Sequence, residues 1–95
     1  MLNEQQLCKV SAVFSALGSP TRLKIVELVS ETERPLHIKA IAQAMKKDYA
    51  TIYRHIGVLE KSRVIGVYEV GRSRVIYLKN VNAIKKCVQI VQEIL

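Results

Sequence analysis

Residues 46–55, KKDYATIYRH, combine cations, hydroxyl groups and small side chains with almost no aliphatic bulk, in a chain that is 49% hydrophobic. Side chains of these types can read a DNA duplex. Arginine can donate two hydrogen bonds to guanine or reach a phosphate, tyrosine and threonine hydroxyls can donate, and methyl groups fit the thymine methyl. The candidates for DNA contact in this segment are Lys46, Lys47, Tyr49, Ala50, Thr51, Tyr53 and Arg54.

A second basic segment is GRSR at residues 71–74, between the runs IGVYEV and RVIYLK. Two β-branched and aromatic runs around such a turn predict a hairpin. Its tip carries two guanidinium groups, with the length and chemistry to enter a minor groove or bind its phosphates. Arg72 is the better candidate, because strand alternation turns Arg74 toward the apolar face with Ile76. Ser73 completes this set.

The positive charge is concentrated around these two segments. The net charge is +7, and residues 46–79 hold eight Lys or Arg against three acidic residues, whereas residues 1–45 and 80–95 contribute only +1 each. A basic protein is attracted to polyanions, of which nucleic acid comes first and an anionic membrane surface second. An ordinary solvated surface would explain isolated cations, but it does not explain this segregation.

The hydrophobic pattern predicts the elements that must position these residues. Helical spacing and β-branched runs indicate helices over 3–17, 20–31, 37 or 38 to 45, 48–62 and 81–95, a short extended piece before the third helix, and a hairpin at 65–79. Ser19, Asp48 and Asn80 are expected to cap helices. In the 48–62 helix Ile52, Ile56 and Leu59 form the buried stripe, so the DNA-contact candidates fall on the exposed side of its first turns.

The same pattern limits what the chain can be. Residues 1–95 provide one small domain, since a chain of this length has no material for a second core. No stretch approaches the ~18 apolar residues of a membrane span, and the N-terminus is unlike a signal peptide, so a cytoplasmic protein is expected. We find no nucleophile motif, phosphate-binding glycine loop or paired carboxylates, so neither an enzyme nor a cofactor is expected.

Three segments together resemble ArsR-type regulators of bacteria and archaea. ALGSPTRLKIVELV is similar to their second-helix signature, and TIYRHIGVLEKSRVI and VGRSRVIYL to their recognition helix and wing, so that the resemblance spans roughly residues 14–79. It implies an α+β, mainly α, winged helix-turn-helix fold and a homodimeric regulator, in the role of a repressor, on a roughly palindromic double-stranded operator. The alternative is a winged-helix adaptor that binds protein in a transcription or replication assembly.

The helices expected at 3–17 and 81–95 carry more apolar surface than a one-sided helix needs, which suggests a second copy of the chain as partner. ArsR-type proteins pair their first and last helices across a two-fold axis. The interface residues expected here are Leu7, Val10, Phe14, Ile84, Cys87, Val88, Val91 and Ile94.

The cysteines and histidines can be explained without a metal site. Cys8 and Cys87 fall on the two interface helices, so a disulfide within or between subunits is geometrically allowed, the alternative being two buried reduced thiols. Where metal-sensing ArsR-type proteins carry Cys-x-Cys, this chain has LHIKAIAQ, so no metal is expected. His37 and His55 do not form a site, and we expect His55 to pack or hydrogen-bond beside the 48–62 helix.

Overall fold

The structure is a computed structural model that describes residues 1–32 and 34–95. Within these residues the chain forms five helices and one small sheet, so the expected mainly helical α+β fold is confirmed. The elements in chain order are α1 (Glu4–Leu17), α2 (Pro20–Ser30), β1 (Leu36–His37), α3 (Ile38–Met45), α4 (Tyr49–Lys61), β2 (Ile65–Val70), β3 (Ser73–Leu78) and α5 (Val81–Ile94).

Side-chain caps set where the helices begin. Ser19 and Asn80 each accept a hydrogen bond from the backbone N–H three residues further on, at 3.3 and 3.0 Å, as the sequence predicts. The start of α1 has a capping box that the sequence analysis missed. There the Asn3 side chain accepts from the Gln6 N–H at 2.8 Å, and the Gln6 side chain accepts from the Asn3 N–H at 3.0 Å.

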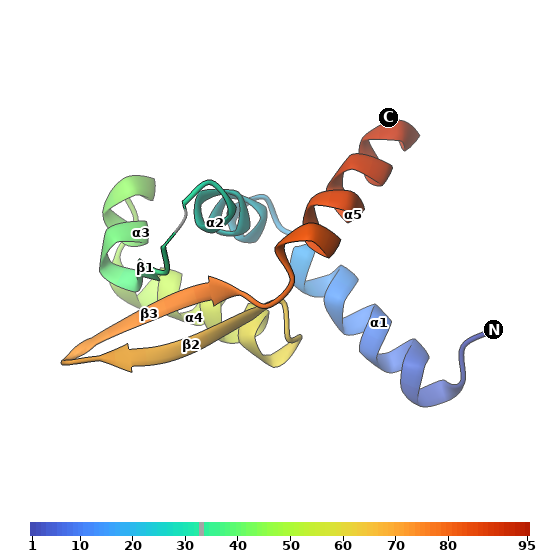
Figure 1. The fold of residues 1–95 in the computed structure, drawn as a ribbon, viewed down its shortest axis with the longest axis horizontal. Helices are drawn as coiled ribbons and strands as arrows, with labels where there is room; N and C mark the ends of the chain where they lie inside the picture. Colours follow the sequence, from blue (N-terminus) through green and yellow to red (C-terminus); the bar gives the residue numbers. More distant parts are fainter. Residues whose placement is uncertain (33) are drawn as a thin grey trace.

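The sheet is antiparallel with strand order β1-β3-β2, so the hairpin strand β3 lies in the middle. Ile76 of β3 is paired with Leu36 on one side and Val67 on the other, which brings the short strand after α2 onto the hairpin. At the tip Gly71 has a φ of 62°, a left-handed conformation that glycine adopts without strain. Figure 1 shows the hairpin projecting away from the helices as a narrow wing.

The core lies between α2, α3, α4 and the base of the hairpin. Its fully buried large side chains are Ile25, Ile38, Ile41, Ile52, Leu59, Ile65 and Ile76. The stripe expected on α4 is confirmed, because Ile52, Ile56 and Leu59 are all buried. One large apolar side chain of α2 lies outside the core: Leu23 is 42% exposed, at the edge where α2 approaches α5.

Helices α1 and α5 extend from the end of the molecule opposite the wing tip (Figure 1). In α1 only Ala16 and Leu17 are buried, and α5 has no buried residue. The two helices therefore gain little from packing within one chain. Within the described residues, no helix combines the length and the apolar character needed to cross a bilayer.

Candidate nucleic-acid interface

The first turn of α4 is fixed by Asp48, the predicted cap. Its carboxylate accepts from the Thr51 N–H at 3.2 Å and from the Thr51 hydroxyl at 2.6 Å. These hydrogen bonds, that of the Thr51 side chain above all, lower the pKa of Asp48, so the cap stays ionised at neutral pH. The sequence predicts Thr51 as a hydrogen-bond donor to DNA. Because the Thr51 hydroxyl already donates its hydrogen bond to Asp48, the methyl group is the part of Thr51 that can face a base.

The turn between α3 and α4 presents its two lysines to solvent. Lys46 has a φ of 56°, the left-handed conformation that ends α3, and the Lys47 N–H donates to the Ala42 carbonyl at 3.0 Å. Both lysines are exposed. The backbone of the turn is thus satisfied internally, and the two ammonium groups are free to meet phosphates.

Tyr49 and Tyr53 form an aromatic pair on the exposed side of α4. Their rings are stacked with centroids 6.0 Å apart, and their exposed fractions are 46% and 41%. Ala50 and Arg54 lie exposed beside them. Among the residues that the structure describes, Arg54 makes only a long contact within its own helix, from Nη2 to Thr51 Oγ1 at 3.5 Å, so its guanidinium is available to a ligand.

Arg74 links the wing to α4. Its Nη1 donates to the Tyr53 hydroxyl at 2.6 Å, its guanidinium carbon lies 5.2 Å from the centroid of the Tyr53 ring, and Nε lies 3.8 Å from Glu69. The expectation that Arg74 turns toward apolar side chains is wrong. Strand alternation gives the correct face, but the core does not reach this far along β3, so the exposed guanidinium meets the phenol of Tyr53 instead.

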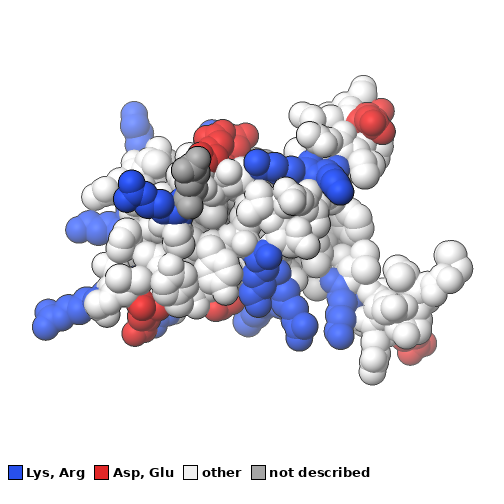
Figure 2. Space-filling model, viewed as in Figure 1, with Lys and Arg blue, Asp and Glu red and all other residues white. Residues whose placement is uncertain are grey.

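The tip of the wing carries the remaining candidates. Arg72 and Ser73 directly follow Gly71 in the chain, and both are exposed. Figure 2 shows Lys and Arg side chains at the tip of the wing and along the lower edge of the molecule, with acidic side chains between the tip and the lower-edge cations. The structure thus brings the wing candidates and the α4 candidates to the same end of the molecule, joined by the contact of Arg74 with Tyr53.

Arg22 is a positioning residue that sequence reasoning missed. Its Nε and Nη2 donate to the carbonyls of Ala16 and Ser15 at 2.5 and 3.2 Å, at the end of α1, and its Nη1 lies 3.2 Å from Nδ1 of His55 in α4. A guanidinium only donates, so Nδ1 must be the acceptor and the imidazole must be neutral. Arg22 therefore joins α1, α2 and α4, and the structural role expected for His55 is confirmed.

The surroundings of His55 favour its neutral form. Burial lowers the pKa of the imidazole, and the positive charges of Arg22, Arg54 and Lys47 lower it further. Protonation at Nδ1 would remove the acceptor of the Arg22 hydrogen bond and would place two cations in contact. The hydrogen bond between Arg22 of α2 and His55 of α4 therefore depends on a neutral His55.

Comparison with known proteins agrees with this geometry. The family model HVO_A0114 matches residues 17–82, which span the chain from the end of α1 to the start of α5. The chain belongs to the HVO_A0114 family. An uncharacterized HTH-type transcriptional regulator of Methanocaldococcus jannaschii is 29% identical over 86 residues, covering 90% of this chain and 94% of the relative.

Solved structures show the same fold as this HVO_A0114 family member. The homodimeric winged helix-turn-helix DNA-binding domain of a possible ArsR-family regulator from Mycobacterium bovis has a TM-score of 0.82 at 21% identity, over 97% of this chain and 88% of that one. HlyU from Vibrio cholerae has a TM-score of 0.78 at 13% identity, over 94% and 97%. The predicted resemblance to ArsR-type winged helix-turn-helix regulators is confirmed.

The HVO_A0114 chain leaves the predicted dimer surface uncovered. Leu7, Val10 and Phe14 of α1 are exposed, as are Val88, Val91 and Ile94 of α5, while Ile84 and Cys87 are half-buried. An apolar groove of about 250 Å³ lies between these helices, lined by Phe14, Leu17, Gly18, Leu23, Cys87, Val88, Val91 and Gln92. The predicted interface residues thus surround an apolar surface that this chain does not fill by itself.

The cysteines are not bridged within the chain. Cys8 is exposed and Cys87 is half-buried, and both are free thiols. Within one chain Cys8 is not covered, because α1 has so little of the chain packed on it. Among the described residues no three His, Cys, Asp or Glu side chains lie close enough to hold a metal ion together.

Proposed function

We propose that this chain is a homodimeric transcriptional regulator, in the role of a repressor, that binds double-stranded DNA through α4 and the wing. The proposal rests on one observation: the exposed side of the first turns of α4 and the wing form one basic surface, fixed by the contact of Arg74 with Tyr53. The names of the M. jannaschii and M. bovis proteins support the same reading.

The α4 helix would lie in the major groove with its N-terminal residues on base edges, as the second helix of a helix-turn-helix does. Arg54 suits guanine, and the Ala50 and Thr51 methyl groups suit thymine. Tyr49 has an exposed hydroxyl that can donate to a base or a phosphate. Lys46 and Lys47 would meet backbone phosphates, and Arg72 and Ser73 would reach the neighbouring minor groove or its phosphates.

A second copy would cover the apolar surface of α1 and α5. A two-fold dimer places two reading helices about one helical turn of DNA apart, roughly 34 Å, and predicts a pseudo-palindromic operator. A dimer bound at such an operator excludes other proteins from the same DNA, which is the simplest route to repression. Cys8 and Cys87 would lie in or beside this interface, where a bridge between subunits would appear as a dimer band on a non-reducing gel of protein alkylated at lysis.

Two substitutions on the proposed DNA-binding surface test the function. Arg54→Ala should reduce the preference for a selected duplex over random duplex by about 5- to 150-fold, equivalent to about 1–3 kcal/mol, because a base contact is lost. Arg72→Ala should weaken both duplexes alike and flatten the salt dependence by about one unit of slope. Gel shifts at two salt concentrations, after selection of bound duplexes from a random pool, measure both effects.

The same gel shifts distinguish the adaptor alternative. A wild-type protein that shifts no duplex at low salt would reject DNA binding and favour a protein partner. A shift that both variants leave unchanged would reject the assignment of α4 and the wing as the binding surface.

A further inference from the structure

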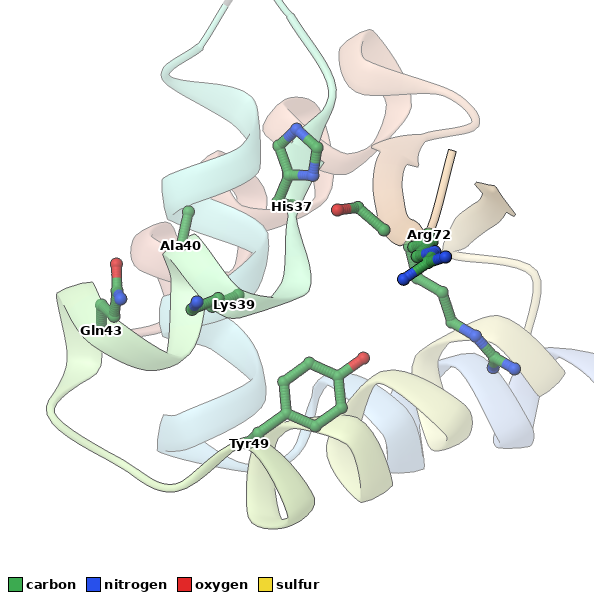
Figure 3. Close-up of a pocket in the computed structure, with 8 residues that line it drawn as sticks. His37, Lys39, Ala40, Gln43, Tyr49 and Arg72 are labelled. Atoms are coloured by element: carbon green, nitrogen blue, oxygen red, sulfur yellow. The ribbon is translucent and has the colours of Figure 1, made fainter. Parts of the chain in front are cut away.

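A cleft of about 460 Å³ opens between α3, the N-terminal end of α4 and the wing tip (Figure 3). Lys39 and Gln43 of α3 line one wall, Tyr49 of α4 lies on another side, and Arg72 comes from the wing. All four side chains are exposed. The α3 residues do not belong to the surface proposed above, so the cleft extends that surface onto a third element.

The charges around the cleft favour an anion. Lys39 and Arg72 reach it from different elements, and neither forms an ion pair with any described residue. Arg74 also lines the cleft, but Glu69 lies 3.8 Å from its guanidinium and offsets part of its charge. No carboxylate is among the described residues that line the cleft. Two cations without a counter-ion therefore face one open volume, which attracts a negative group.

Neutral hydrogen-bond donors complete the surroundings. Gln43, Ser73 and Tyr49, whose side chains carry neutral hydrogen-bond donors, line the cleft together with His37. A phosphate group is tetrahedral and accepts hydrogen bonds on several oxygens at once, and each bond from a cation is strengthened by charge. Donors that approach from several elements suit a phosphate better than a planar carboxylate, which one guanidinium can satisfy.

We propose that this cleft binds a phosphate group, with Lys39 and Arg72 supplying the charge and Gln43 a neutral hydrogen bond. One source is the DNA backbone, and that source rests on the proposed function. A helix in the major groove has a phosphate strand along each edge, and the cleft lies directly beside the N-terminal end of α4. The other source is a free phosphorylated molecule, which has the same chemistry.

The DNA source is tested by the salt dependence of duplex binding. Lys39→Gln should reduce the slope of log affinity against log salt by about 0.9, the value for one phosphate contact. Gln43→Ala should lower the affinity without changing the slope, because it removes a neutral donor. Lys24→Gln is the matched control: it removes the same charge from α2, where Lys24 pairs with Glu27 at 2.7 Å and lines no part of the cleft, so the slope should stay at the wild-type value.

The free source is tested without DNA, by titrating the protein with sodium pyrophosphate and following backbone amide resonances. Shifts at Lys39, Ala40 and Gln43 that disappear in Lys39→Gln would support a free phosphate ligand. This support would hold even if the protein binds no duplex. If the wild type binds duplex, Lys39→Gln keeps its slope and pyrophosphate moves none of these resonances, the cleft proposal is overturned while DNA binding stands. If duplex binding is absent and pyrophosphate has no effect, both proposals fail.

Discussion

At the residue scale, Tyr53 has two roles that its position in the sequence does not reveal. It stacks on Tyr49 within α4, and its hydroxyl accepts from Arg74 of the wing at 2.6 Å. A hydroxyl that already binds a guanidinium can still donate its own proton to DNA. Tyr53 is therefore both a candidate DNA contact and the point on α4 to which the wing is attached.

The contact of Tyr53 with Arg74 can be measured by substitution. Tyr53→Phe keeps the ring and removes the acceptor, so it should lower the free energy of unfolding by about 0.5–1 kcal/mol, at the low end for a hydrogen bond because both groups are exposed. A double-mutant cycle with Arg74→Ala should give a coupling of similar size. Tyr49→Phe is the matched control, since the Tyr49 hydroxyl makes no hydrogen bond to a described residue. A zero coupling between Tyr53→Phe and Arg74→Ala would mean that the wing is not held at Tyr53.

His55 predicts a pH dependence of stability. Its pKa is lowered in the folded protein, so the unfolded chain binds a proton more readily once the pH falls below about 6.5, the ordinary value. The stability contributed by neutral His55 is complete above that pH and is lost as the pH falls through the folded pKa. Denaturant unfolding from about pH 7.5 down to 5 should show this loss.

The histidine variants identify the group that titrates. His55→Gln should flatten the pH dependence, because glutamine does not gain a proton. His37→Gln removes the only other histidine of the chain and should leave the dependence in place. Equal profiles for wild type and His55→Gln would show that the contact of Arg22 with His55 is not sensitive to protonation.

At the element scale, the hairpin depends on a close contact between paired residues. Gly66 of β2 lies opposite Tyr77 of β3, and a Cβ added at Gly66 would clash with the Tyr77 ring. The Tyr77 ring thus covers the backbone of Gly66, and it also packs on Tyr68 with centroids 5.7 Å apart. A side chain at position 66 would therefore require the Tyr77 ring to move.

Gly66→Ala should lower the free energy of unfolding by about 1–3 kcal/mol, the usual cost of overpacking, because the Tyr77 ring must move. The same substitution in a Tyr77→Ala background should cost much less, since the clashing ring is gone. Thermal or denaturant unfolding of the four proteins gives the comparison. If Gly66→Ala lowers the free energy of unfolding equally in both backgrounds, the strain lies in the backbone and not in the contact with the ring.

The elements themselves were largely predictable from sequence, because their signals are local. Hydrophobic spacing and the caps at Ser19, Asp48 and Asn80 give the helices, and the GRSR turn gives the hairpin. Contacts between elements were not predictable in this way. Arg22 looks like a surface cation until α1 and α4 meet around it, and the environment of Arg74 depends on how far the core extends along β3.

At the scale of the whole molecule, the apolar faces of α1 and α5 should hold a dimer together. Val91→Asp places a charge in the groove beside Phe14, and burying that charge in an interface without a partner is unfavourable. Sedimentation should then show a monomer where the wild type is a dimer. Asn82→Asp introduces the same group in the first turn of α5, where an acidic residue is tolerated by the helix dipole, and should remain dimeric. A wild-type monomer at high concentration would exclude this interface.

In the proposed dimer, the lack of any buried residue in α5 would make the protein responsive to its own abundance. Helices that pack poorly within one chain are completed by the partner, so the melting temperature of such a dimer rises with protein concentration. Below the dissociation constant, the number of dimers grows as the square of the number of chains. A doubling of copy number would then raise the concentration of DNA-binding dimers about fourfold, so that control by this protein would change over a narrow range of expression.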